Sequence, residues 1–298
     1  MMRGQIRQSL SGYYDVMTSD GQEYRTRARG NFRKKKQTPL VGDFVDFKAE
    51  KADEGYILGI QPRKNQLVRP PVANVDKAVV VTACVEPDFS ANLLDRQLVM
   101  LASNGIEPLI YFSKYDLVST TDQRQVLAEI AAYYRQYYPT FISQTPTEHK
   151  QVQAELLAEL QGQVCVVMGQ TGAGKSTLLN QLDPALQLET GEVSKALSRG
   201  KHTTRKVSLL DIHGALIADT PGFSSFELSN LTKEDLPRLY PDFQEYATAC
   251  KFRGCSHIKE PKCAVREAVT SEKIWSSRYE NYLQFYKMVV DDEKKKYR

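Results

Sequence analysis

Short runs of alternating hydrophobic and polar residues occupy the first 60 residues of the chain. These runs lie at residues 12–16, 22–27, 43–47 and 55–60, and turn residues such as Gly42 separate them. A two-residue period is typical of strands with one buried face, and turns at regular intervals connect such strands. We therefore expect a small N-terminal β-barrel, with an OB-like fold as the leading interpretation.

A different pattern begins around Arg69, where continuous apolar runs of strand length alternate with segments of helical period. The strand-like runs are 78–85, 109–112, 141–142 and 164–168, and the helix-like segments are 93–103, 123–137 and 152–160. Residues 207–210 and 215–218 predict a hairpin. Repeated β-α-β units indicate a mostly parallel sheet that helices cover on both faces.

The last part of the chain, from about Leu231, combines helical spacing with cysteines and basic residues. The three patterns together predict a multidomain protein. Its expected parts are an OB-like barrel over residues 1–69, an α/β domain over residues 70–229 and a mostly helical domain over residues 230–298.

The overall composition is that of a soluble globular protein, with 41% hydrophobic and 26% charged residues. No apolar run reaches the roughly 18 residues of a membrane span. The N-terminus lacks the apolar core of a secretory signal. Five cysteines, an odd number, favour a reducing compartment over a disulfide framework. We therefore expect a cytoplasmic protein that does not bind a membrane, and we expect it to be a monomer.

The charge is unevenly distributed along the chain. Residues 1–69 hold 14 Lys and Arg against 8 Asp and Glu, whereas residues 70–229 hold 12 against 17 and residues 230–298 hold 14 against 11. Seven cations lie near Phe32 with no acid among them: Arg25, Arg27, Arg29, Arg33, Lys34, Lys35 and Lys36. Cations beside an aromatic side chain suit contact with a nucleic-acid backbone and a stacked base. A solvated hairpin is the alternative interpretation.

A complete phosphate-binding loop follows the strand-like run 164–168. The pattern G-x-x-x-x-G-K-[ST] is matched by Gly169, Gln170, Thr171, Gly172, Ala173, Gly174, Lys175 and Ser176, and Thr177 follows in the predicted helix. The glycines let backbone N–H groups converge on phosphate oxygens at the N-terminus of a helix. We expect Lys175 to reach the β- and γ-phosphates of a nucleotide and the Ser176 hydroxyl to bind Mg²⁺.

A second pattern associated with nucleotides, D-x-x-G, follows the strand-like run 215–218. Asp219, at the end of this strand, is expected to hold the water shell of Mg²⁺. The backbone N–H of Gly222 is expected to approach a γ-phosphate. The pattern is weak in isolation, but its place at a strand end beyond the phosphate loop makes it specific.

The third pattern, Ser113-Lys114-Tyr115-Asp116, follows the strand-like run 109–112 and resembles the N/T-K-x-D motif for guanine. Guanine presents N1–H and N2–H₂ donors that one carboxylate can accept together. Asp116 would be that acceptor, and the Lys114 stem would pack along the base. An ATP-dependent phosphotransferase and an RNA-binding module with a structural nucleotide remain as alternatives.

The guanine pattern precedes the phosphate loop, whereas ordinary GTPases have the reverse order. A cut between two strands, with the old termini joined, preserves such a sheet when the joined ends lie close together. The chain therefore resembles, over nearly its whole length, the circularly permuted GTPase family known as RsgA, YjeQ or YloQ. This resemblance implies an OB-like N-terminal domain, a permuted GTPase domain that opens near residue 74 and a C-terminal zinc domain.

The same resemblance implies a function. Members of this family hydrolyse GTP during late maturation of the small (30S) ribosomal subunit, and the subunit stimulates this hydrolysis. The expected partners are therefore GTP, GDP and the small ribosomal subunit with its 16S rRNA. The OB-like and zinc domains are expected to contact the rRNA.

Two positions depart from the family pattern. Ser113 stands where Asn or Thr is usual, and we expect the loss of a hydrogen bond that braces the phosphate loop. The next guanine element, usually Ser-Ala, is Ser143-Gln144 in this chain. Both departures concern nucleotide affinity, because the identity of the base depends on Asp116.

Three cysteines and one histidine lie close together in the last segment, with the spacing Cys250-(x4)-Cys255-x-His257-(x5)-Cys263. Four N and S ligands are the number that a closed tetrahedral Zn²⁺ site requires. The spacing also matches the zinc motif of the family, and reduced surface cysteines are the alternative. We expect one structural Zn²⁺ that stabilises a small domain with few large apolar residues.

The residue after D-x-x-G is Phe223, where many GTPases have a glutamine that orients the attacking water. We therefore expect slow intrinsic hydrolysis, accelerated when a partner completes the site. The basic stretch 198–205 suits a first switch, in which Thr203 or Thr204 closes on Mg²⁺. By the family resemblance, His202 is the candidate for positioning the water.

The permuted order also suggests a mechanical link. The chain runs from the second switch at residues 222–223 almost directly into the predicted zinc domain. Loss of the γ-phosphate contacts is therefore expected to move that domain.

Overall fold

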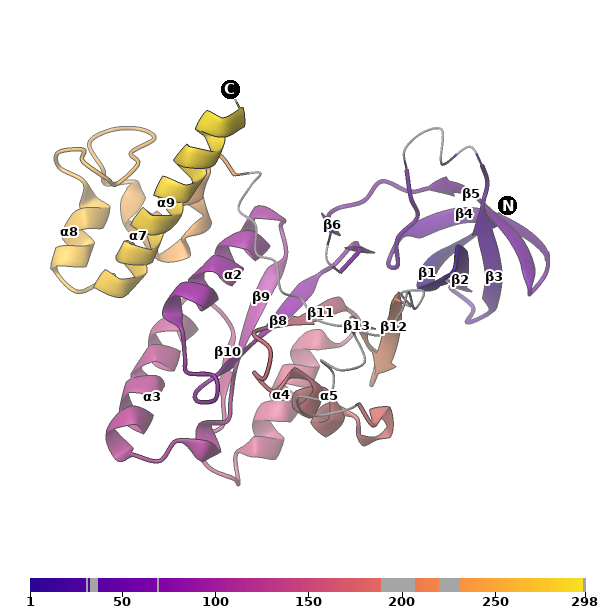
Figure 1. Cartoon of the computed structure of the whole chain (residues 1–298), viewed down its shortest axis with the longest axis horizontal. Coiled ribbons are helices and arrows are strands. Elements are labelled where there is room, and N and C mark those ends of the chain that lie inside the picture. Colours follow the sequence, from indigo (N-terminus) through magenta and orange to yellow (C-terminus); the bar gives the residue numbers. More distant parts are fainter. Residues whose placement is uncertain (31, 33–36, 69, 189–206, 220–230, 297–298) are drawn as a thin grey trace.

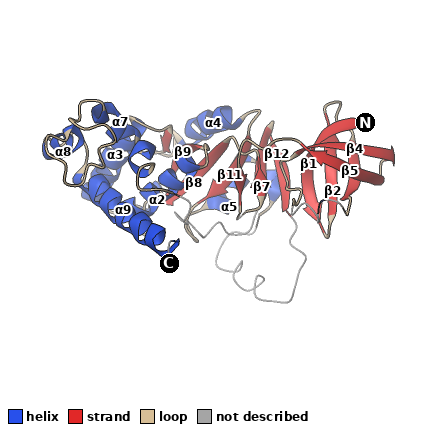
Figure 2. Cartoon of the chain, turned by 90° about the horizontal axis from the view of Figure 1, so that it is seen from above, coloured by secondary structure: helices blue, strands red, loops and turns tan. Residues whose placement is uncertain are grey.

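The computed structural model describes the chain except for residues 31, 33–36, 69, 189–206, 220–230 and 297–298. The described residues form three parts in a row, as Figure 1 and Figure 2 show. A β-barrel lies at the N-terminal end, an α/β layer in the middle and a group of helices at the C-terminal end. This arrangement confirms the predicted multidomain fold class.

Five strands form the N-terminal barrel. They are β1 (Met2–Leu10), β2 (Tyr13–Thr18), β3 (Glu23–Ala28), β4 (Phe44–Lys51) and β5 (Glu54–Ile60). The pairing runs β1–β2–β3–β5–β4 and returns from β4 to β1, which closes the ring. Inward-facing side chains such as Ile6, Val45 and Ile57 are fully buried, as alternation along the strands requires. The predicted barrel is confirmed, and β1 is an additional strand that the sequence pattern did not predict.

Six strands form the central sheet. They are β8 (Lys77–Ala83), β9 (Glu107–Ser113), β10 (Thr140–Ile142), β11 (Val164–Met168), β12 (Val207–Ile212) and β13 (Ala215–Asp219). Their order is β10-β9-β8-β11-β13-β12, and all neighbours are parallel except the hairpin of β12 with β13. Both the mostly parallel sheet and the hairpin after the phosphate loop are therefore confirmed.

Helices cover both faces of this sheet (Figure 1). They are α2 (Ala91–Ser103), α3 (Thr121–Arg135), α4 (His149–Leu160) and α5 (Lys175–Leu182), with short 3-10 helices η1 (Tyr115–Leu117) and η2 (Pro184–Leu186). Val80 of β8 belongs to one buried cluster with Leu98 of α2. Its neighbour Val81 belongs to a different buried cluster, together with Leu156 of α4 and Leu178 of α5. Successive residues of β8 thus fill two cores, which explains its continuous apolar sequence.

The barrel and the central sheet are joined by backbone hydrogen bonds. Strand β1 pairs antiparallel with β12 at Gln8↔Ser208 and Ser9↔Val207. The described strands from β10 to β4 therefore form one 11-stranded sheet. The connecting segment adds a hairpin of β6 (Gln66–Leu67) and β7 (Val72–Ala73), and the Ala73 N–H donates to the Val41 carbonyl at 2.9 Å.

The C-terminal helices pack around an aromatic core. They are η3 (Leu236–Leu239), α7 (Pro241–Ala247), α8 (Ala264–Thr270) and α9 (Ser276–Lys296). Phe243, Tyr282 and Phe285 are almost fully buried there, and Val99 of α2 belongs to the same cluster. The helical part is therefore docked firmly on the α/β layer. No helix within the described ranges has both the length and the hydrophobicity that crossing a membrane requires.

A buried ionic network crosses the contact between the helical part and the α/β layer. Arg278 of α9 is 2% exposed and donates to Asp242 of α7 at 2.9 Å and to Asp95 of α2. The Tyr133 and Tyr134 hydroxyls of α3 donate to these carboxylates at 2.9 and 2.7 Å. Burial opposes the charge of Arg278, but the two carboxylates outweigh it and raise its pKa well above the ordinary value. Movement of the helical part must therefore carry α2 and α3 along or break this network.

Candidate active site and metal centre

The two nucleotide motifs lie at one edge of the central sheet. Strands β8 and β11 are adjacent and parallel, but the neighbour on the far side of β8 is β9 and that of β11 is β13. The strand order thus changes direction between β8 and β11. In open α/β sheets, ligands bind beyond the carboxyl ends of the strands at the point where the order changes direction. The phosphate loop follows β11 and the guanine pattern follows β9, so the topology brings them together although they are distant in sequence.

The phosphate loop, residues 169–174, is shaped by glycines with positive φ. Gly169 has a φ of +148°, and a Cβ there would lie 2.1 Å from the carbonyl oxygen of Val81 in β8. Gly174 has a φ of +91° and is the N-cap of α5. Other residues would be strained at both positions, because the loop passes against the backbone of β8 and then turns into α5. The unpaired N–H groups of the first turn of α5 are thereby placed for an anion.

Lys175 is the cation of this loop. Its ammonium group donates to the carbonyl oxygens of Gly169 and Gln170 at 3.0 and 2.8 Å. Burial lowers its pKa below the ordinary value, which means that the charged form lacks full solvation. A phosphate group would supply the missing counter-charge. Ser176 follows in the same turn of α5, and the exposed Thr177 comes next.

The guanine pattern contacts the phosphate loop directly. The Ser113 hydroxyl donates to the carbonyl oxygen of Ala173 at 2.6 Å, and both residues are buried. The expected loss of a bracing hydrogen bond is therefore wrong. The Ser113 side chain also lies against Gly174, 3.6 Å from the position that a Cβ would take there, which is ordinary van der Waals contact.

A loop that the sequence analysis did not single out forms a third side of this site. It follows β8 at residues 84–90. The Lys114 ammonium donates to the carbonyl oxygen of Glu86, and Pro87 lies 3.7 Å from the position of a Cβ on Gly172. Phe89 stacks on Phe112 of β9 with ring centroids 5.8 Å apart. One sequence feature could have indicated this loop. It is the Glu-Pro-Asp turn directly after a buried strand, at the carboxyl edge of the sheet.

Asp116 lies in η1, and its side chain is exposed. Burial, and then the negative charge of Asp116, raise the pKa of the Cys84 thiol to about 12. The same two causes raise the pKa of Tyr111 to about 12. The Asp116 charge therefore acts at the ends of β8 and β9, the edge where Ser113 meets the phosphate loop.

The second guanine element lies after β10. The Ser143 hydroxyl donates to the carbonyl oxygen of Thr145 at 2.9 Å, and the Gln144 N–H donates to Glu148 at 3.0 Å. These bonds close a turn that leads into α4. Asp219 ends β13, where its backbone pairs with that of Ser208. The other candidates of the two switches, His202, Thr203, Thr204, Gly222 and Phe223, lie outside the described residues.

Cys250, Cys255, His257 and Cys263 form a compact cluster, as their spacing predicts. Their ligand atoms all lie within 4.8 Å of one another. The Nδ1 of His257 is 3.7 Å from the Sγ of Cys250 and 3.3 Å from that of Cys263. Zn–S bonds of about 2.3 Å and Zn–N bonds of about 2.0 Å in a tetrahedron require separations of this size. The cluster therefore fits one structural Zn²⁺, held by three thiolates and the Nδ1 of His257.

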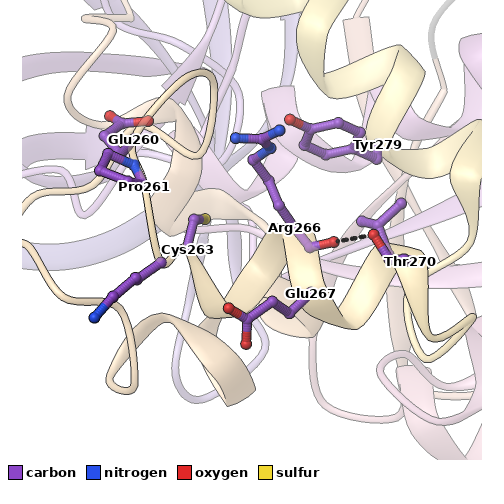
Figure 3. Close-up of a pocket in the computed structure, with 9 residues that line it drawn as sticks. Glu260, Pro261, Cys263, Arg266, Glu267, Thr270 and Tyr279 are labelled. Atoms are coloured by element: carbon purple, nitrogen blue, oxygen red, sulfur yellow. Dashed lines mark hydrogen bonds between the residues drawn. The ribbon is translucent and has the colours of Figure 1, made fainter.

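A carboxylate supports the loop between the last ligands. Glu260 accepts hydrogen bonds from the N–H and hydroxyl of Ser256 at 2.7 and 2.6 Å and from the N–H of Ile258 at 2.9 Å. Burial raises the pKa of Glu260, but these bonds outweigh it and lower the pKa to about 2. Figure 3 shows Glu260 and Cys263 on the loop that enters α8. Glu260 thus fixes the metal loop, a role that no sequence motif indicated.

The order of the motifs on this sheet, with the guanine element encoded before the phosphate loop, defines a circularly permuted GTPase. The family model of the RsgA GTPase matches residues 60–229, and that of the RsgA N-terminal domain matches residues 3–57. The chain belongs to the RsgA GTPase family and hydrolyses GTP. Mg²⁺ is the metal that accompanies GTP in such enzymes.

Relatives are similar to this chain over nearly their whole length. The small ribosomal subunit biogenesis GTPase RsgA of Limosilactobacillus reuteri is 57% identical over 293 residues, covering 98% of each protein. That of Leuconostoc citreum is 54% identical, covering 100% of this chain and 98% of the relative. The crystal structure of YloQ, a circularly permuted GTPase, is 39% identical in sequence with a TM-score of 0.81. The match covers 98% of this chain and 96% of the YloQ chain. That of YjeQ from Thermotoga maritima is 32% identical with a TM-score of 0.82, covering 97% and 98%.

Proposed function

We propose that this GTPase acts in the cytoplasm as a late maturation factor of the small ribosomal subunit, and that the subunit stimulates its GTP hydrolysis. The similarity to relatives named for small-subunit biogenesis supports this proposal. The nucleotide-dependent part of the proposal rests on the contact between Ser113 and Ala173, which joins a guanine element to a phosphate loop in one site. Such a site suits a nucleotide-dependent switch.

The nucleotide is bound through its phosphates and its base. The phosphates lie on the backbone of residues 169–174 and on Lys175, and the guanine N1–H and N2–H₂ donate to Asp116. The Lys114 stem packs along the base, and the turn at Ser143 lies beyond it. Ser176 would hold Mg²⁺, with Asp219 in its water shell, and the bound ion would supply charge neutralisation for the phosphates. The Gly222 N–H contacts the γ-phosphate.

Hydrolysis forms a bond between a water oxygen and the γ-phosphorus while the bond to the β–γ bridging oxygen breaks. The products are GDP and phosphate. Phe223 cannot orient the water, because a phenyl ring neither donates nor accepts a conventional hydrogen bond. We assign this task to His202, with Thr204 closing the first switch, when the small subunit is bound. Intrinsic turnover is slow for that reason.

The barrel and the zinc-binding part contact the 16S rRNA. On the barrel, Tyr13, Arg27, Tyr56 and Lys48 are successive neighbours across β2, β3, β5 and β4. The Arg27 guanidinium lies 4.2 Å from the ring centroid of Tyr13, and Tyr56 is exposed. Aromatic rings that alternate with cations suit stacked bases and phosphates. In the sequence, four further cations stand at residues 33–36.

The proposed functional parts are the RNA-binding barrel over residues 1–69, the permuted GTPase domain over 70–229 and the zinc-binding domain over 230–298. The chain is proposed to act as a monomer. Light scattering of the purified protein would detect a dimer, which would contradict the last point.

The test is GTP turnover with and without purified small subunits. We expect slow turnover alone and a large increase with small subunits, which large subunits do not reproduce. An unchanged rate would exclude the proposed function. High ionic strength should reduce the stimulation, because contacts with rRNA phosphates release counterions.

A further inference from the structure

A groove lies over one side of the zinc cluster, outside the nucleotide site, and Cys250, Cys255 and His257 form part of its wall. It is bordered by η3, α7, the turn between Cys250 and Cys255, and Tyr286 of α9, and its volume is about 560 Å³. Among the residues that line it are Lys233, Arg238, Lys251, Phe252 and Arg253. We call it the zinc-loop groove. Its size suits one or two nucleotides or a short peptide segment rather than a whole folded partner.

The zinc-loop groove carries an excess of positive charge. Lys233 pairs with Glu234 at 3.7 Å and with Glu293 at 3.9 Å, so its charge is balanced. The other cations of the groove form no salt bridge within the described part of the chain; they are Arg238, Lys251 and Arg253. Three exposed cations around a concave surface attract an anionic partner.

A second hollow, of about 410 Å³ beside α8, provides a contrast (Figure 3). Its charged lining residues are Glu260, Lys262, Arg266 and Glu267, two acids and two bases. It therefore has no comparable excess of either sign. The charge of the zinc-loop groove is a property of that face and is not shared by the whole domain.

Phe252 distinguishes the expected partner from a simple polyanion. Its ring is 43% exposed, and the Lys251 ammonium lies 5.3 Å from the ring centroid. An exposed phenyl ring beside a cation offers a flat surface where a planar, electron-rich group can stack. The bases of a paired RNA helix are stacked on one another, so only an unpaired base can use this ring.

The metal site holds this ring in place. Residues 251–254 span the interval between the ligands Cys250 and Cys255, so bound zinc would fix both ends of the turn. Gly254 completes the turn with a φ of +69°. A ring held in this way loses little conformational freedom when a base binds, which favours affinity.

We propose that the zinc-loop groove binds an unpaired segment of RNA, with phosphates on Arg238, Lys251 and Arg253 and a base stacked on Phe252. This inference rests on the proposed function and deepens it, since it names the form of RNA that the zinc-binding part selects. An acidic protein segment is the competing partner and is one outcome of the test below.

The test uses the full, zinc-loaded chain with a fluorescent reporter in the groove. Trp275 is the single tryptophan of the chain and stacks on Tyr133, so Trp275→Phe removes the background signal and retains a ring. Phe252→Trp then places the only indole at the proposed stacking position. We expect single-stranded oligoadenylate to quench this indole, whereas a hairpin duplex, heparin and polyglutamate do not.

A matched control places the indole elsewhere. Val126 of α3 is 54% exposed, and Val126→Trp in the Trp275→Phe background should show no quenching by oligoadenylate. Arg238→Ala should lower the salt dependence of quenching in the groove by about 0.7 in log–log slope, the value for one phosphate of a single strand. Phe252→Ala should weaken binding of the oligonucleotide to the groove by at least about fivefold.

Two results would overturn the proposal. One is an unquenched groove indole while anisotropy shows the oligonucleotide bound to the chain. The other is equal quenching by polyglutamate, which would identify an acidic peptide as the partner. Turnover of the same variant with small subunits is measured in parallel. Stimulated turnover with an unquenched indole would refute this inference alone, whereas absent stimulation of the unaltered chain would refute the proposed function.

Discussion

The hydroxyl of Ser113 lies 2.6 Å from the carbonyl oxygen of Ala173, a hydrogen bond between residues 60 positions apart. Ser113 ends β9, and Ala173 belongs to the phosphate loop after β11. The bond therefore crosses β8 at the carboxyl edge of the sheet and connects the segment of the guanine pattern to the phosphate loop.

Removal of this bond should weaken nucleotide binding. Ser113→Ala leaves the buried carbonyl of Ala173 without its donor, which costs about 1–3 kcal/mol. We expect the affinity for GDP to fall by roughly tenfold, measured by titration with a fluorescent GDP analogue. Ser113→Thr keeps the hydroxyl and serves as the control. Equal affinities of the alanine variant and the unaltered chain would contradict the assigned role.

Asp116→Asn should relax the preference for guanine. The amide has one oxygen to accept and one nitrogen that opposes the guanine donors, so the paired acceptance of N1–H and N2–H₂ is lost. The ratio of GDP to ADP affinity should fall by at least about tenfold, measured by competition. Asp122→Asn, in the first turn of α3, is a matched control of the same charge change. An unchanged ratio would place guanine recognition elsewhere.

Arg278→Met should destabilise the contact between the helical part and the α/β layer. Asp95 and Asp242 would remain buried without their cation, and breaking such a pair costs about 3–5 kcal/mol. The urea midpoint, followed by tyrosine and tryptophan fluorescence, should fall clearly. Lys294→Met removes a largely exposed pair with Asp291 and should leave the midpoint unchanged. Equal midpoints for both variants would refute this account.

Zinc removal should destabilise the C-terminal helices. His257→Ala removes one of four ligands, and we expect the chain to lose its zinc and its melting temperature to fall by about 10 °C. Metal content by atomic absorption and thermal unfolding measure both effects. Cys165→Ala alters a buried thiol of β11 outside the cluster and should keep one zinc per chain. Full zinc occupancy in the His257 variant would contradict the ligand set.

His202→Ala tests the assignment of the water-positioning residue. Intrinsic turnover should change by less than about twofold, because His202 is proposed to position the water only when the small subunit is bound. Stimulated turnover should fall by about 100-fold, the usual effect of a group that acts on the attacking water. His213→Ala, in the turn between β12 and β13, is the control. Undiminished stimulation in the His202 variant would remove the assignment.

Strand and helix order in the central sheet could be predicted from the sequence because each strand is buried on both faces. Val80 and Val81 illustrate this, since they serve different cores and both must be apolar. Strand β1 could not be predicted in the same way. Its large apolar residues are only Met2, Ile6 and Leu10, four positions apart, and the polar Gln5 is buried with a hydrogen bond to the Gly42 carbonyl.

The site was predicted where chemistry is tied to a fixed spacing, as in the phosphate loop and the metal ligands. Contacts made by backbone atoms do not require a particular residue type, so no sequence motif marks them. The Glu86 carbonyl that accepts from Lys114 has no side-chain requirement, so no motif reveals it. The Ser113 bond was predicted to be absent because Asn or Thr is usual at this position, and the distance to Ala173 shows that the serine hydroxyl makes such a bond.

The permuted sheet has a consequence for how the chain folds as it is synthesised. Of the central sheet, β8, β9 and β10 leave the ribosome first, yet β8 gains its second neighbour only when β11 is made, and β1 meets β12 later still. An unpaired strand edge is prone to wrong pairing, and distant contacts close slowly. A nascent chain that ends before residue 169 has no phosphate loop, so nucleotide binding cannot assist its early folding. The first half must reach a compact state without help from GTP.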